Sequence, residues 1–154
     1  MKAGFSPSLF FIARLAWLLP AAFAALLSAL SAPAAAFAPA HEKSVRAVVE
    51  AQLAALARDD AHRAFSFAAP NVRQAVGSAP AFLAMVQRSY PAIYRPSSVA
   101  FLRPEGRDGQ AIQRVQVVDS DGDAWLAIYS LQLQKDKSWR ITGCNIVANK
   151  GRMA

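Results

Sequence analysis

The chain is poor in cysteine and short, and each shortage excludes a class of protein. Cys144 is the single cysteine among 154 residues, so no intramolecular disulfide can form and the chain is not a disulfide-stapled scaffold. At 154 residues the chain is also too short for a barrel enzyme or a two-domain cofactor enzyme. We therefore expect one ordinary domain, with room for a targeting segment.

Charged side chains are absent from Leu15 to Ala40, and this gap predicts an export signal. Its strongly apolar part, Leu15–Leu30, has 16 residues, whereas a helix that spans a bilayer needs about 20. Basic residues before this run and small residues after it are typical of a secretory signal peptide. We predict that residues 1–36 are a signal peptide cut between Ala36 and Phe37. An uncleaved membrane anchor is the alternative.

The predicted mature protein, residues 37–154, has 118 residues and an excess of basic side chains. It keeps 15 basic and 10 acidic residues, a net charge of +5, without any block of like charge. A dispersed excess keeps a small protein soluble and attracts anionic surfaces weakly, whereas nucleic-acid binding requires clustered charge. We expect a periplasmic or secreted protein with no nucleic-acid partner, which contacts the membrane only through residues 1–36 before cleavage.

Apolar residues recur at helical spacing in the first half of the mature chain. Val45, Val49, Leu53 and Leu56 fall on one stripe, which predicts an amphipathic helix. Further helices are expected where capping residues and prolines bound such patterns. The predicted helical segments are residues 42–58, 61–68 (capped by Asp60), 71–76, and a segment from Ser78 that ends at Pro91.

After Pro96 the apolar period changes from 3.6 to 2, which predicts strands. The expected strands are residues 98–103, 112–119, 125–134 and 139–147, with a turn-rich connection at 104–109 and a hairpin turn at Asp121-Gly122. Helices followed by a strand meander predict an α+β domain. The N-terminal helices would pack on one face of a curved antiparallel sheet.

Two features of this pattern resemble a known superfamily. The long first helix ends in the sequence Ala-Leu-Ala-Arg-Asp-Asp60, and Trp139 opens the last strand. Over residues 42–148 the chain resembles the nuclear-transport-factor-2-like (cystatin-like cone) superfamily. Within it, the runs at 64–70, 82–86 and 90–96 and the pair Gly143-Cys144 are similar to an uncharacterised exported bacterial family.

The resemblance implies a cone-shaped fold with an internal pocket, and it leaves the activity open. Some members of the superfamily are isomerases, dehydratases or cyclases that act on apolar substrates, and others only bind ligands or pair with proteins. The enzymes need an aspartate or histidine base inside the cone. No acid–histidine pair in this sequence matches that arrangement, so we predict no catalytic residue.

Three aromatic residues form the candidate ligand-binding site. We predict that Tyr94 gates an opening of the cone and that Trp125 and Tyr129 line it, because small-ligand pockets are mostly apolar with a few polar groups. The ligand would be small and apolar. The alternative is that these side chains fill the core.

The other chemistry-bearing residues have structural explanations. Asp60 is accounted for as a helix cap, and His62 lies at an exposed helix start. The alternating acids of 119–123 lack the glycine and glutamate that a calcium loop has at its sixth and twelfth positions. Cys144 is expected to pack as a small hydrophobe. We predict no metal and no cofactor.

These observations predict an exported, non-catalytic domain that binds a small ligand or interacts with proteins, with a homodimer through the open sheet face as one assembly. The alternative is an isomerase or dehydratase-type enzyme with Asp60 or His62 as its base. An open apolar cavity would favour the binder, and an acid or imidazole pointing into it would favour the enzyme. A filled cone with an exposed apolar sheet patch would favour the interaction module.

Overall fold

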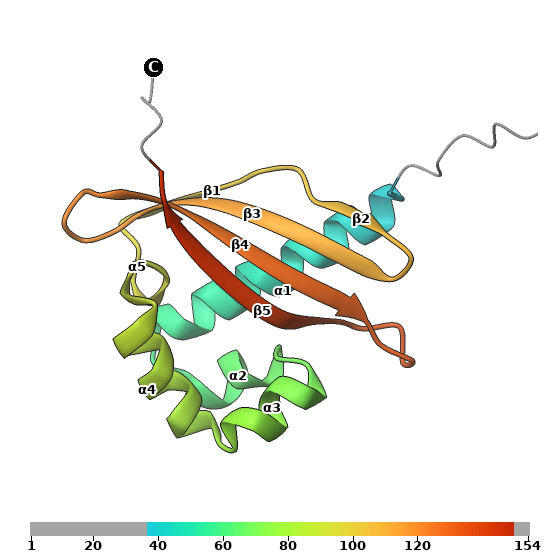
Figure 1. The fold of residues 1–154 in the computed structure, drawn as a ribbon, viewed down its shortest axis with the longest axis horizontal. Helices are drawn as coiled ribbons and strands as arrows, with labels where there is room; N and C mark the ends of the chain where they lie inside the picture. The colour runs from blue at the N-terminus through green and yellow to red at the C-terminus, as the bar shows by residue number, and fades with distance from the viewer. Residues whose placement is uncertain (1–36, 150–154) are drawn as a thin grey trace, which may run out of the picture. The chain divides into compact units, whose positions relative to one another are not determined.

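The computed structural model describes residues 37–149. The predicted signal peptide, residues 1–36, lies outside the described residues, and Phe37 after the predicted cut is described. Five helices are followed by a five-stranded antiparallel sheet with the strand order β1-β3-β4-β5, in which β2 also pairs with β3. Figure 1 shows the helices gathered on one side of the curved sheet. The predicted α+β architecture is confirmed. None of the described helices is long and apolar enough to cross a membrane.

The first two helices form where the apolar stripe and the acidic cap predict them. Helix α1 spans Pro39–Ala57, with proline in its first turn, and its apolar stripe is buried. Asp59 follows with a φ of 56°, a left-handed conformation that turns the chain. Helix α2 spans Ala61–Ser66, and its predicted cap is confirmed, because the Asp60 carboxylate accepts a hydrogen bond of 3.0 Å from the Arg63 backbone N–H.

Three further helices complete the helical layer. Helix α3 spans Pro70–Val76, and helix α4 spans Ala79–Ser89 with Ser78 as its cap. Helix α5, Pro91–Tyr94, begins at Pro91, where the last helix was expected to end. Pro91 explains the difference, because a proline at the first helical position already has the helical φ and lacks only an N–H that would be unsatisfied anyway.

The strands lie within two residues of their predicted bounds, with one addition. They are β1 Ser98–Phe101, β2 Glu105–Arg107, β3 Gln110–Val118, β4 Ala124–Leu133 and β5 Trp139–Ala148. Strand β2 lies within a segment expected to be a turn, because three residues around a glycine carry no apolar alternation. It pairs with the start of β3 and places Gly106 opposite Ala111.

The two faces of the sheet differ in burial. On the inner face, alternate residues of β3 and β4 such as Val115, Ala127 and Leu131 are buried and pack with α1 to form the core. The intervening side chains form the outer face, which we define as Ile112, Arg114 and Gln116 of β3, Leu126, Ile128 and Ser130 of β4, and Asn145 and Val147 of β5. The pairing of β4 with β5 shifts its register between Ser130 and Leu131. The β5 residues of this face, Asn145 and Val147, come after this shift along β5.

Candidate functional site

The three predicted site aromatics all pack against one core, but two of them use their polar atoms structurally. Trp125 and Tyr129 lie on the inner face of β4, and Tyr94 ends α5. The Tyr94 hydroxyl donates a hydrogen bond to the Asp59 carboxylate. The indole N–H of Trp125 donates to the Asp119 carboxylate at 2.7 Å. These two side chains are therefore anchored by acids that the sequence analysis did not connect with them.

Tyr129 differs because its hydroxyl is buried without a hydrogen-bond partner. Its side chain has no exposed surface, and none of the described residues bonds its Oη. Gln113 of β3 pairs with it on one side and Cys144 of β5 on the other. We call these three inner-face residues the polar row. The Gln113 amide donates to the carbonyls of Leu102 and Arg114 at 2.7 and 2.8 Å, but its own Oε1 accepts no bond.

Burial keeps the two titratable side chains of the polar row, Tyr129 and Cys144, protonated. It raises the pKa of the Tyr129 phenol well above the usual value, and the neighbouring Cys144 adds to the shift. Burial also raises the pKa of the Cys144 thiol to about 12, against a smaller lowering by the Tyr129 hydroxyl. A thiol attacks as its thiolate, so Cys144 is not an activated nucleophile, and it packs against the core as predicted. The row is a neutral polar strip inside an apolar core.

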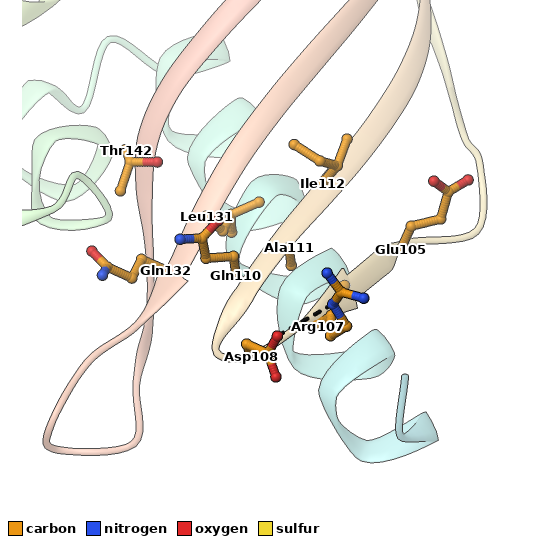
Figure 2. Close-up of a pocket in the computed structure, with 10 residues that line it drawn as sticks. Glu105, Arg107, Asp108, Gln110, Ala111, Ile112, Leu131, Gln132 and Thr142 are labelled. Atoms are coloured by element: carbon orange, nitrogen blue, oxygen red, sulfur yellow. Dashed lines mark ion pairs between the residues drawn. The ribbon is translucent and has the colours of Figure 1, made fainter. Parts of the chain in front are cut away.

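A pocket of about 590 Å³ lies at the end of the sheet instead of inside the cone. Figure 2 shows residues that line it, from β2, from the turn into β3, and from β4 and β5. Its polar lining includes Glu105, Arg107, Asp108, Gln110, Gln132 and Thr142. Arg107 and Asp108 form an ion pair of 3.2 Å with both side chains mostly exposed. The volume suits a small molecule, but the charged groups are solvated and already paired.

This pocket was missed by the sequence analysis for a local reason. Its walls come from the segment around Gly106 that was expected to be a turn, and from outward-facing strand residues that carry no pattern of their own. The exposed acids and bases beside each other in β2 were the one available signal.

The residues considered as a base or as metal ligands lie at the surface. Asp60 caps α2 and His62 is exposed. Asp119 accepts from the backbone N–H groups of Asp121 and Asp123, at 3.0 and 2.9 Å, as a hairpin turn requires. Bonding to Trp125 is the main reason why the pKa of Asp119 is lowered. Within residues 37–149 no group of three His, Cys, Asp or Glu side chains is placed to hold a metal.

Helices packed on one face of a curved antiparallel sheet define the nuclear-transport-factor-2-like class of α+β fold. The chain is similar to an NTF-2-like protein of unknown function from Silicibacter pomeroyi DSS-3, with a TM-score of 0.51 and 21% identity over 71% of this chain and 97% of that chain. An NTF-2-like protein of unknown function from Burkholderia xenovorans LB400 matches with a TM-score of 0.47 and 12% identity, over 73% of this chain and 88% of that chain. At 21% identity, the likeness to the Silicibacter pomeroyi protein supports the fold alone.

A family model described as Domain of unknown function (DUF4864) matches residues 38–154, so the chain belongs to this family. The resemblance to an uncharacterised family within the nuclear-transport-factor-2-like superfamily is thereby confirmed. No curated protein matches the chain.

Proposed function

We propose that this chain is exported and that its folded domain is a non-catalytic interaction module that associates through the outer face of its sheet, in the first place with a second copy of itself. The observation that carries the proposal is the unequal filling of the two sides of the sheet. The inner side is packed, with Tyr129, Leu56 and Leu131 among its most buried side chains. The outer face is left uncovered by every described helix (Figure 1).

Apolar side chains of adjacent strands meet at the middle of the outer face. Leu126 lies between Gln116 and Val147, and the next outward residue of β4 is Ile128. Val147 is 41% exposed, so this side of the outer face presents apolar surface to solvent. An apolar centre of this kind is what a symmetric dimer would bury, since a two-fold axis brings the same patch of both copies together.

One ion pair lies beside this centre, because Arg114 of β3 is the register partner of Ile128. Arg114 forms a salt bridge of 2.8 Å with Glu105, so its charge is compensated within the same chain. A compensated charge costs less to cover in an interface than a free one. The outer face therefore combines apolar side chains with a neutralised ion pair.

The self-association is tested by measuring the mass of a chain beginning at Phe37, which contains every described helix and strand, by analytical ultracentrifugation. We expect a dimer for this chain and a monomer for the double variant Leu126→Arg/Ile128→Arg, because two charges would be buried without partners. The matched control is Ala47→Arg, which adds an arginine at an exposed position of α1. A monomeric parent chain at every concentration would refute the dimer.

A small apolar ligand near Tyr94, Trp125 and Tyr129 is the second candidate, and one observation favours it. The unpaired oxygens of Tyr129 and Gln113 lie on neighbouring strands and offer a buried donor and acceptor. Native mass spectrometry of protein recovered from the periplasm tests both ideas together with export. A chain starting at Phe37 supports the proposed signal cleavage, and an adduct of a few hundred daltons would favour the binder over the dimer module.

A further inference from the structure

The positive charge of the described domain is distributed unevenly along the chain. From Ala61 to Arg95, the segment that contains helices α2 to α5, there are four arginines and no acidic residue. The rest of the described chain, residues 37–60 and 96–149, has nine basic and ten acidic residues. The net positive charge of the described domain therefore comes from one segment of 35 residues.

Three of these arginines are exposed on successive helices and are not neutralised. We call Arg63 of α2, Arg73 of α3 and Arg88 of α4 the arginine face. Figure 1 shows α2, α3 and α4 gathered together in the helical layer, and the connection between α2 and α3 pairs with β5 through Ala68 and Ile141. Arg73 and Arg88 form no ion pair with any of the described residues, and the Arg63 guanidinium lies 5.6 Å above the Phe67 ring.

The acids that precede this segment do not cancel the charge. Asp59 is bonded by Arg95 and Tyr94, so it neutralises the fourth arginine and not the arginine face. The Asp60 carboxylate accepts from the backbone N–H of Arg63 and forms no ion pair with a guanidinium group of the described residues. Three guanidinium groups thus remain available to an anion from outside the chain.

The side chains around the arginine face indicate which anion fits. The exposed large apolar residues of the described chain are Val99, Leu102 and Val147, and all three lie in or beside strands. Tight protein interfaces depend on buried apolar or aromatic anchors, which helices α2 to α4 do not expose. An anionic lipid surface needs no such anchor, because it attracts basic groups through charge, and guanidinium groups pair well with phosphate.

We propose that the arginine face binds the phosphate headgroups of an anionic membrane, as a reversible and salt-sensitive peripheral contact. This goes beyond the interaction module proposed above and uses a different face of the domain. It departs from the expectation from the sequence that only residues 1–36 contact a membrane. The three arginines are separated by ten and fifteen positions, so the sequence shows no block of charge, although they belong to three helices that lie in one layer (Figure 1).

The test is co-sedimentation of the chain beginning at Phe37 with vesicles of phosphatidylcholine that contain phosphatidylglycerol. We expect binding at low salt, loss of binding at high salt, and no binding to pure phosphatidylcholine. Each arginine near the surface is worth about five-fold in affinity, so Arg73→Gln/Arg88→Gln should weaken binding about 25-fold. The matched control, Lys135→Gln/Lys137→Gln, removes the same charge from exposed positions of the turn between β4 and β5 and should retain most of the affinity.

Three results would overturn the proposal. A chain that fails to bind the anionic vesicles at low salt has no such site, and equal losses for the two double variants would mean that net charge alone is responsible. Soluble poly-glutamate serves as a charge-matched probe for an acidic protein partner. If it binds the chain through Arg73 and Arg88 while the vesicles do not, the partner is an acidic polypeptide and not a membrane. Circular dichroism of each variant checks that the fold is retained.

Discussion

Replacing Tyr129 by phenylalanine is expected to stabilise the domain. The substitution removes a hydroxyl that is buried without a hydrogen-bond partner and leaves the ring in place between Gln113 and Cys144. An unsatisfied buried hydroxyl costs about 1–3 kcal/mol, and the weak contact with the thiol recovers part of that cost. We therefore expect the free energy of unfolding of Tyr129→Phe to rise by about 1 kcal/mol, with a melting temperature about 4 °C higher.

The measurement is urea and thermal unfolding of the chain beginning at Phe37 at neutral pH, followed by circular dichroism. Tyr90→Phe is the control, because Tyr90 is only partly buried and should change little. A loss of stability in Tyr129→Phe by about 1 kcal/mol or more would refute the reasoning. It would mean that the hydroxyl holds a water or a ligand, and the small-ligand candidate would then gain support over a filled cone.

The remaining predictions concern pH, packing and assembly. Burial raises the pKa of the Cys144 thiol from 9.0 to about 12. The folded state therefore holds the thiol proton more tightly than the unfolded state, and the stability that this contributes is complete below pH 9 and is lost as the pH rises toward 12. Unfolding titrations should show the parent losing about 1 kcal/mol more than Cys144→Ala between pH 9 and 10. Gly106→Ala should destabilise the chain by about 1–3 kcal/mol in urea unfolding, because its Cβ would lie 2.6 Å from a backbone carbonyl oxygen, whereas Gly143→Ala, with no atom within 4 Å, should be tolerated. If the outer face forms the dimer, the two helical layers point apart, so the parent should cross-link anionic vesicles and raise turbidity. Leu126→Asp/Ile128→Asp, which should break the dimer without adding basic charge, should bind them without cross-linking.

The sequence predicted most of the fold because its local signals agree with the tertiary structure. The apolar stripe of α1, the caps Asp60 and Ser78, and the change of period after Pro96 each correspond to an observed element. Helix α5 and strand β2 were missed because each is at most four residues long. Elements of that length are determined by their packing and pairing, which periodicity cannot show.

The candidate site was harder to predict because its properties depend on neighbours across strands. Tyr129 could be identified as an inward aromatic, but its lack of a partner follows from the register that sets Gln113 and Cys144 beside it. The anchoring of Tyr94 by Asp59 joins residues 35 positions apart. A side chain's chemistry can be read from the sequence, whereas the satisfaction of its polar atoms can be read only from the fold.

The distribution of charge follows the same logic and gives the domain two different surfaces. A net charge is a sum over the chain, and it says nothing about where the compensating acids lie. Here the acids lie in α1, in the connection to α2, and along the sheet and its turns, so Glu105 can neutralise Arg114 while Arg73 and Arg88 remain without partners among the described residues. The outer face is therefore suited to burial against another protein surface, and the arginine face is suited to an anion that stays hydrated. In the folded domain the charge of the outer face is compensated, and the arginine face carries the net positive charge.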